Sequence, residues 1–333
     1  MRAITMGLTC LDIINDNKKI KINLGGTAGN VASVLSSLGI EVYDFVPDYS
    51  DEWNEYMQKL LQQRNVRTVS FTKTKKVVPK IIEVIDLIDC NHHFYVTCPK
   101  CGKKLNEVVL PTIKQILNEK EILRQADILF TDRLSDGISK AIEIVRNNQG
   151  LTIYEPNVCR FYNQLLSSAG KVDIVKFSNE RILDIYANKL KEDLKNFNTK
   201  LIINSLGRDG VRYSIKNDEG YFGKWIYLDA ILTNNFVDAS GAGDWLTAAF
   251  IYYFFNKATN KINFSERDIT EALMSAQNIS SFVCGFTGAQ EIFDSRNLQI
   301  SFKNRFNLKI DIEAKSNIVP DISKICDKCY NKI

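Results

Sequence analysis

The sequence has neither a long hydrophobic run nor a block of charge of one sign. Its longest apolar stretch, residues 245–255, would be about 16 Å long as a helix, whereas a bilayer core is roughly 30 Å thick. The 43 basic and 39 acidic residues are mixed along the chain and leave a formal net charge of +4. We therefore expect no membrane span, no membrane-binding surface and no basic arm for nucleic acid.

An export signal is also missing from the start of the sequence. The stretch MRAITMGLTCLDIIND contains a single Arg, and Asp12 interrupts it before an apolar region of signal-peptide length develops. We therefore expect a cytoplasmic protein, in which eight cysteines are not expected to form a disulfide framework. We also find no internal repeat, low-complexity tract or obvious linker.

What is present is an alternation of strand-like and helix-like segments, with 45% hydrophobic residues to build a core. This pattern predicts an α/β fold with a mainly parallel sheet covered by helices on both faces. Antiparallel strands are expected at 210–215 and 220–228, and Ser50 and Ser265 are candidate helix caps. The expected parallel strands cover residues 2–8, 42–46, 127–131, 151–156, 172–177 and 200–207, and the expected helices cover 29–39, 50–65, 112–123, 135–148, 179–194, 245–255 and 265–283.

Two regions depart from this alternation. Residues 20–24 and 66–97 are interpreted as a small β-strand layer beside the main sheet, which could act as a lid over a site. Residues beyond about 290 are polar and weakly periodic, and they are interpreted as a tail lying on the body. We therefore expect one domain over residues 1–290 and a tail over 291–333.

The stretch DASGAGDWLTAAF, residues 238–250, places two glycines before an apolar helix. Glycines let the backbone turn tightly and approach a ligand, and the following helix points free N–H groups and its positive dipole end at the turn. Asp244 could cap the helix or act as a base beside a bound phosphate. Taken alone, the stretch favours a capped, buried helix over a phosphate site.

Three further features favour a ligand site. NLGGTAGNVASVLSSLG, residues 23–39, is a second glycine-dense turn before a helix, and Asn30 is expected to face the space above the sheet. Asp12 follows the first strand by a short turn, near the edge where open α/β sheets bind ligands. NSLGRDG ends a later strand with a turn at Gly207 that could lie along a nucleotide.

Two of these stretches carry a resemblance. GGTAGNVASVLSSLG and DASGAGDWLTAAF resemble the two signatures of the ribokinase-like (phosphofructokinase B) carbohydrate kinase family, over about residues 1–290. The resemblance implies a three-layer sandwich with a small β-strand lid, an ATP site with Mg²⁺, and a sugar or nucleoside bound under the lid. A homodimer formed through the lid is also possible in such kinases.

The resemblance also implies roles for individual residues. Asp244 would accept the proton of the acceptor hydroxyl, and Asp238 would lie near a monovalent cation unless it caps its turn. The remaining roles are charge stabilisation by the backbone N–H groups of Gly241, Ala242 and Gly243, acceptor binding at Asp12, Gly25, Gly26 and Asn30, and nucleotide binding at Ser205, Gly207 and Asn179.

Two stretches depart from the family pattern. The family usually has an Asn-x-x-Glu motif that organises Mg²⁺, but FSNERILD places Ile182 or Arg181 at the Glu position, and Glu180 has the wrong spacing. YEPNVCR resembles an Asp-Pro-Asn-x-Arg motif with Glu155 for Asp and Arg160 one place late. A non-catalytic sensor or scaffold that keeps the fold and binds nucleotide or sugar is therefore the alternative function.

The cysteine pairs are not a general feature of that family. CPKCGKK, within an insertion at about 90–106, contains Cys98 and Cys101 and is typical of a zinc-ribbon knuckle, and CDKC supplies Cys326 and Cys329 as a second knuckle. We expect these four thiolates to share one structural Zn²⁺, which would tie the tail to the lid side of the chain. The alternatives are unrelated thiols or redox pairs, or participation of the neighbouring residues 92 and 93, both His, as ligands.

Overall fold

The computed structural model describes residues 1–15, 20–86, 91–98, 101–105, 107–157, 161–257, 264–308, 310 and 326. Within this part of the chain, no helix is both long enough and apolar enough to cross a membrane.

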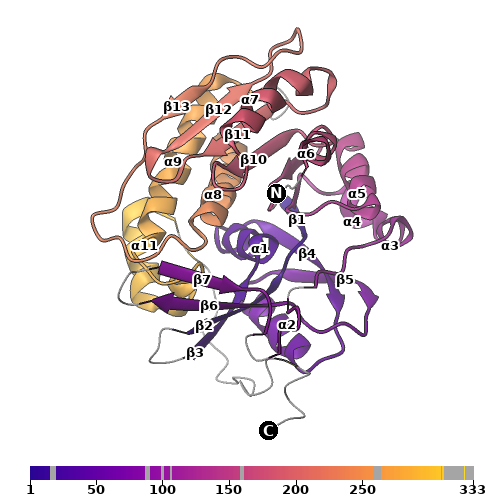
Figure 1. Ribbon diagram of the computed structural model, residues 1–333, viewed down its shortest axis with the longest axis vertical. Coiled ribbons are helices and arrows are strands. Elements are labelled where there is room, and N and C mark those ends of the chain that lie inside the picture. The colour runs from indigo at the N-terminus through magenta and orange to yellow at the C-terminus, as the bar shows by residue number, and fades with distance from the viewer. Residues whose placement is uncertain are drawn as a thin grey trace.

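The main sheet has the strand order β13-β12-β11-β10-β9-β8-β1-β4-β5 (Figure 1). All neighbours from β5 to β11 are parallel, and β12 and β13 add antiparallel strands at the other edge, so the expected sheet is confirmed. The strands are β1 Arg2–Met6, β4 Glu41–Asp48, β5 Arg67–Lys73, β8 Ile128–Thr131, β9 Leu151–Tyr154, β10 Ile174–Ser178, β11 Leu201–Ser205, β12 Val211–Ile215 and β13 Ile226–Leu228.

A second sheet, which we call the lid sheet, has the order β3-β2-β6-β7, with β2 Cys10–Asn15, β3 Ile20–Gly25, β6 Lys80–Asp86 and β7 Asn91–Tyr95. The expected lid range of 66–97 is wrong at its start, because β5 pairs with β4 in the main sheet. Asp12 follows β1 after a short turn, as expected, but it lies within β2, a lid strand that is not predicted from the sequence. For β5, local alternation identifies a strand but does not identify the partner with which it pairs.

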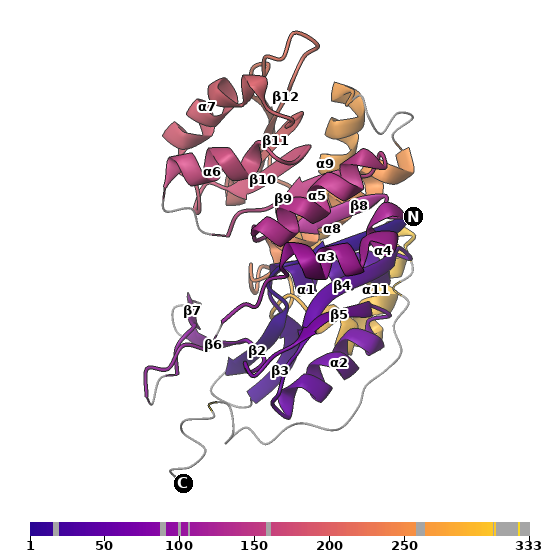
Figure 2. The same ribbon diagram turned by 90° about the vertical axis from the view of Figure 1, so that its right-hand side faces the viewer.

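Helices cover both faces of the main sheet. Figure 2 shows α6 and α7 on one side of the sheet and α9 on the other. Ser265 caps α9 by accepting a bond from the Asp268 N–H at 3.0 Å, whereas Ser50 caps nothing because α2 begins after Glu52. The helices are α1 Thr27–Ser37, α2 Trp53–Gln63, α3 Ile113–Asn118, α4 Lys120–Arg124, α5 Asp136–Asn147, α6 Tyr162–Ala169, α7 Asp184–Asp193, α8 Ala242–Lys257, α9 Glu266–Val283, α10 Glu291–Asp294 and α11 Arg296–Phe306, with short 3₁₀ turns η1 Leu194–Asn196 and η2 Gly207–Asp209.

The first part of the expected tail, residues 291–306, forms the helices α10 and α11, which pack on the body of the protein. In α11, Phe302 is completely buried and its ring lies 6.0 Å from that of Trp245 and 5.8 Å from that of Phe282. Because Phe302 is the one fully buried side chain of this helix, the hydrophobic period is weak in the sequence. The body of the protein therefore extends at least to residue 306.

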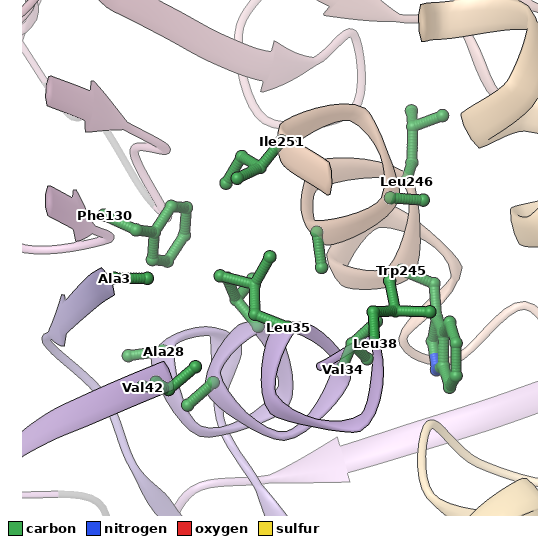
Figure 3. Packing of buried hydrophobic residues seen from close by; sticks show 14 of the residues in the cluster. Ala3, Ala28, Val34, Leu35, Leu38, Val42, Phe130, Trp245, Leu246 and Ile251 are labelled. Carbon is green, nitrogen blue, oxygen red and sulfur yellow. The ribbon is translucent and has the colours of Figure 1, made fainter. Parts of the chain in front are cut away.

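The helices α1 and α8 pack directly against each other. Figure 3 shows Val34 and Leu35 of α1, and Leu38 just after its end, beside Trp245 and Leu246 of α8. Because α8 is apolar around most of its circumference, it can be buried on all sides. This contact fixes the relative positions of the two glycine-rich turns at the N-terminal ends of these helices.

Candidate active site

The two glycine-rich turns meet through Asn30 and Asp244. The Asn30 Nδ2 donates to the Asp244 Oδ2 at 2.7 Å, although the residues are 214 positions apart in the chain. Asn30 is 4% and Asp244 9% exposed. Gln290 donates from its Nε2 to the Asn30 Oδ1 at 2.7 Å, so the Asn30 amide is held with its nitrogen toward Asp244.

The turn before α8 has a conformation that requires glycine. Gly241 has a φ of +77°, and a Cβ there would lie 2.2 Å from the Ala289 side chain. Asp238 holds this turn, because one of its oxygens accepts from the Ser240 N–H and the other from the Gly288 N–H, each at 2.6 Å. Asp238 therefore caps its turn, as in one of the two roles predicted for it. The first turn of α8 directs its positive end at this loop.

Asp244 lies near a buried ion pair, Lys176 and Glu155, whose charges act on its pKa. Lys176 donates to the Glu155 Oε1 at 2.7 Å and to the Gly243 carbonyl at 3.0 Å, and Thr247 donates to the other Glu155 oxygen at 2.7 Å. Burial, followed by the negative charge of Glu155, raises the pKa of Asp244 to about 7, against the hydrogen bond from Asn30 and the charge of Lys176. Asp244 can therefore take up or release a proton near neutral pH.

The predicted acceptor positions lie where the lid sheet approaches this turn. The Asp12 carboxyl lies over Gly25, where a Cβ would come within 2.0 Å of it. Burial, then the negative charges of Glu83 and Asp244, raise the pKa of Asp12 to about 7. Ser240 of the glycine turn donates to the Glu83 Oε1 of β6 at 2.9 Å, so the lid sheet is bonded to the turn.

Gly26 forms the corner that starts α1. Its φ is +78°, and a Cβ would lie 2.3 Å from the Leu8 carbonyl oxygen, which accepts the N–H of Ala28 at 3.1 Å. The close approach of these two backbones brings Asn30 next to the lid sheet. Asp12, Gly25, Gly26, Asn30 and Asp244 therefore lie together, as the sequence predicts for an acceptor site.

The three predicted nucleotide positions also lie together. The Asn179 N–H donates to the Ser205 carbonyl at 3.0 Å, which joins the loops after β10 and β11, and Gly207 begins η2 with a φ of +62°. An open pocket beside them is lined by Asn179, Leu183, Asp184, Leu206, Asp209, Arg212 and Tyr227.

The departures from the family motif have structural explanations. Ile182 is 2% exposed and belongs to a buried cluster with Phe177 and Leu190, so its side chain faces the core. Glu180 is exposed. The positive charge of Arg181 partly opposes the rise in the pKa of Asp244 that burial causes. Arg160 lies outside the described residues.

Several residues of the site are not predicted from the sequence. The sequence marks Lys176 in one way, since it is the only charged residue of strand β10. The sequence does not mark Glu83 or Gln290, because their hydrogen-bond partners lie far away in the chain.

Three of the four predicted metal ligands meet at one point. The thiols of Cys98, Cys101 and Cys326 lie within 4.8 Å of one another, and no other group of three or more such ligand residues is found in the described part of the chain. Cys329 lies outside the described residues, as do the side chains of residues 92 and 93.

The architecture is that of the ribokinase-like kinases. The structure is similar to ribokinase from Giardia lamblia, with a TM-score of 0.70 at 13% identity over 92% of this chain and 99% of that one. Adenosine kinase from Sinorhizobium meliloti gives 0.67 at 18% identity over 86% and 95%. A fructokinase double mutant from Vibrio cholerae O395, bound to fructose, ADP and potassium ion, gives 0.66 at 20% identity over 86% and 93%.

The sequence itself identifies the family. Residues 4–296 match the family model of the pfkB family carbohydrate kinases, and the chain belongs to this family. A search of curated protein sequences finds no significant match.

Proposed function

We propose that the protein transfers the γ-phosphoryl group of ATP to a hydroxyl group of a sugar or sugar-like molecule. The observation that carries this proposal is the position of Asp244. Its carboxyl lies at the positive end of α8, directly behind the glycine turn, with a pKa raised to about 7. A base with a pKa near the working pH is suited to accept the proton of a reacting hydroxyl.

The neighbouring residues supply positioning and charge stabilisation, on which phosphoryl transfer mainly depends. Asp12 and Asn30 would bind acceptor hydroxyls, and the N–H groups of Gly241, Ala242 and Gly243 would bind the transferring phosphoryl group. Ser205, Gly207 and Asn179 would contact the nucleotide.

The proposed cofactors are ATP, Mg²⁺ and a monovalent cation. Mg²⁺ neutralises phosphate charge and is commonly held by one or two carboxylates together with the nucleotide phosphates. Since Ile182 or Arg181 stands at the usual Glu position, the phosphates would carry most of this coordination. The potassium ion in the fructokinase structure supports the monovalent cation, whereas Asp238 caps its turn with both carboxylate oxygens. The Zn²⁺ predicted for the cysteine set would take no part in this chemistry.

A nucleoside is the second candidate acceptor, favoured by the similarity to adenosine kinase. The test is ATP consumption by the wild-type protein across pentoses, hexoses and nucleosides, with Asp244→Asn as the inactive control. Turnover with one acceptor class that is lost in the variant supports the proposal. Nucleotide binding without turnover on any acceptor would instead identify the non-catalytic sensor or scaffold.

The lid sheet offers a surface for a second copy of the chain. β7 forms an edge of this sheet, and Phe94, Tyr95 and Val96 are 56%, 42% and 39% exposed there. Sheet edges with exposed apolar side chains favour association. We therefore keep the homodimer through the lid as a proposal.

A further inference from the structure

The thiols of Cys98, Cys101 and Cys326 form a compact group that the phosphotransfer site does not use. Cys101 and Cys326 are 225 residues apart, yet their sulfur atoms are 3.6 Å apart. Cys98 and Cys326 are 5% and 3% exposed, and Leu105 completes a small buried cluster with them.

The separation of the sulfur atoms fits shared coordination of one metal. A disulfide would require an S–S distance of about 2.05 Å. Four thiolates at about 2.3 Å from a tetrahedral Zn²⁺ lie roughly 3.8 Å from one another. The observed 3.6 Å between Cys101 and Cys326 is close to this value.

The backbone around the first cysteine pair has the form of a metal knuckle. The Cys98 N–H donates to the Lys103 carbonyl at 2.7 Å, and the Gly102 N–H donates back to the Cys98 carbonyl at 2.8 Å. Gly102 has a φ of +70°, which a residue with a side chain rarely adopts. This tight turn places two thiols on one side, where they can bind the same ion.

The cysteine group lies behind the lid sheet. Ile82 of β6 packs against it, whereas the next residue, Glu83, accepts the hydrogen bond from Ser240 in the active site. Consecutive side chains of a strand point to opposite faces. The thiols therefore lie on the face of β6 that is turned away from the glycine turn.

We propose that Cys98, Cys101 and Cys326 bind a Zn²⁺ ion that fastens the C-terminal segment to the back of the lid sheet. Zn²⁺ prefers thiolate ligands, and this cluster brings three cysteine sulfur atoms within 4.8 Å of one another. Cys329, which the sequence predicts as a ligand, is the candidate for the fourth position. The ion acts as a cross-link between segments far apart in the chain and has a structural role.

The test is the metal content of the full chain, purified with reductant and without chelator. We expect about one zinc per chain in the wild-type protein. Cys101→Ser and Cys326→Ser should each lose it, and Cys284→Ser, which removes a thiol outside the group, should keep it. Absence of zinc from the wild-type protein, or retention of zinc in both ligand variants, would overturn the proposal.

A second measurement avoids variants that fail to fold. An organomercurial should release zinc from the wild-type protein in proportion to the thiols that it modifies, and Co²⁺ in its place should show a thiolate-to-cobalt charge-transfer band. Metal removal should also increase proteolytic cleavage near residue 326. Zinc release without thiol modification, or a Co²⁺ spectrum without this band, contradicts the site. Because none of these readouts uses kinase activity, the outcome is independent of the proposed function.

Discussion

Replacing Asp244 by Asn should make the protein inactive and more stable at the same time. The folded protein keeps a proton on Asp244 up to about pH 7, whereas an unfolded carboxyl releases it near 3.8. Between these pH values the folded state binds more protons, so stability falls as the pH rises. A pKa raised from 3.8 to about 7 corresponds to roughly 4 kcal/mol, since one pKa unit is worth about 1.4 kcal/mol.

The Asn side chain has the same shape and never ionises. Because Gln290 fixes the orientation of Asn30, the Asn30 N–H group can still donate to an amide oxygen at position 244. We therefore expect the free energy of unfolding of Asp244→Asn to exceed that of the wild type by up to about 4 kcal/mol at pH 8. This difference should shrink toward zero near pH 4.

The assay is urea unfolding of both proteins at several pH values between 4 and 8, combined with steady-state kinetics. The turnover of the wild type should rise with pH through about 7 as Asp244 loses its proton, and the variant should lose about 10²- to 10⁴-fold in kcat. Asp218→Asn, at an exposed turn, is the control and should change neither profile. A stability difference that does not depend on pH would refute the buried-carboxyl reasoning, and an unchanged kcat would refute the role as base.

Three further changes test other parts of the structure. Gly25→Ala would place a Cβ within 2.0 Å of the Asp12 carboxyl, so the KM for the acceptor should rise about tenfold or more while the affinity for nucleotide is kept. An equal loss of acceptor and nucleotide affinity would contradict an acceptor role. Ile182→Glu places a carboxyl at a buried position that is one of the two candidates for the family Glu, so it should lower the free energy of unfolding by about 2–4 kcal/mol without raising kcat; a faster enzyme would show that this position reaches the nucleotide. Phe94→Glu should convert a lid dimer to monomers in sedimentation; a dimer that persists excludes this edge as the interface.

The main sheet could be predicted because its signals are local. Each apolar strand and each following helix has its own hydrophobic period, and βαβ connections then require parallel neighbours. The partner of a strand depends on distant residues, which is why β5 is expected in the lid but pairs with β4 in the main sheet. In α11 the one fully buried residue, Phe302, leaves too weak a period to predict a packed helix.

The candidate site also contains some residues that could be predicted from local sequence and others that could not. The meeting of Asn30 and Asp244 could be predicted because each follows a glycine turn with a recognisable sequence. The pair of Glu155 and Lys176 could not, since Glu155 directly follows β9, Lys176 lies in the middle of β10, and only the fold pairs them. The raised pKa of Asp244 depends first on its burial and then on the charge of Glu155, so it too is visible only in three dimensions.

The two faces of β6 have a thermodynamic consequence. Glu83 contacts the glycine turn on one face, and Ile82 contacts the cysteine cluster on the other. A shift of this strand would therefore change both contacts. By reciprocity of binding free energies, any factor by which a bound metal changes acceptor affinity is the factor by which acceptor changes metal affinity. The rate at which the thiols react with a chromogenic reagent, measured with and without an acceptor, therefore tests for coupling between the two faces of this strand.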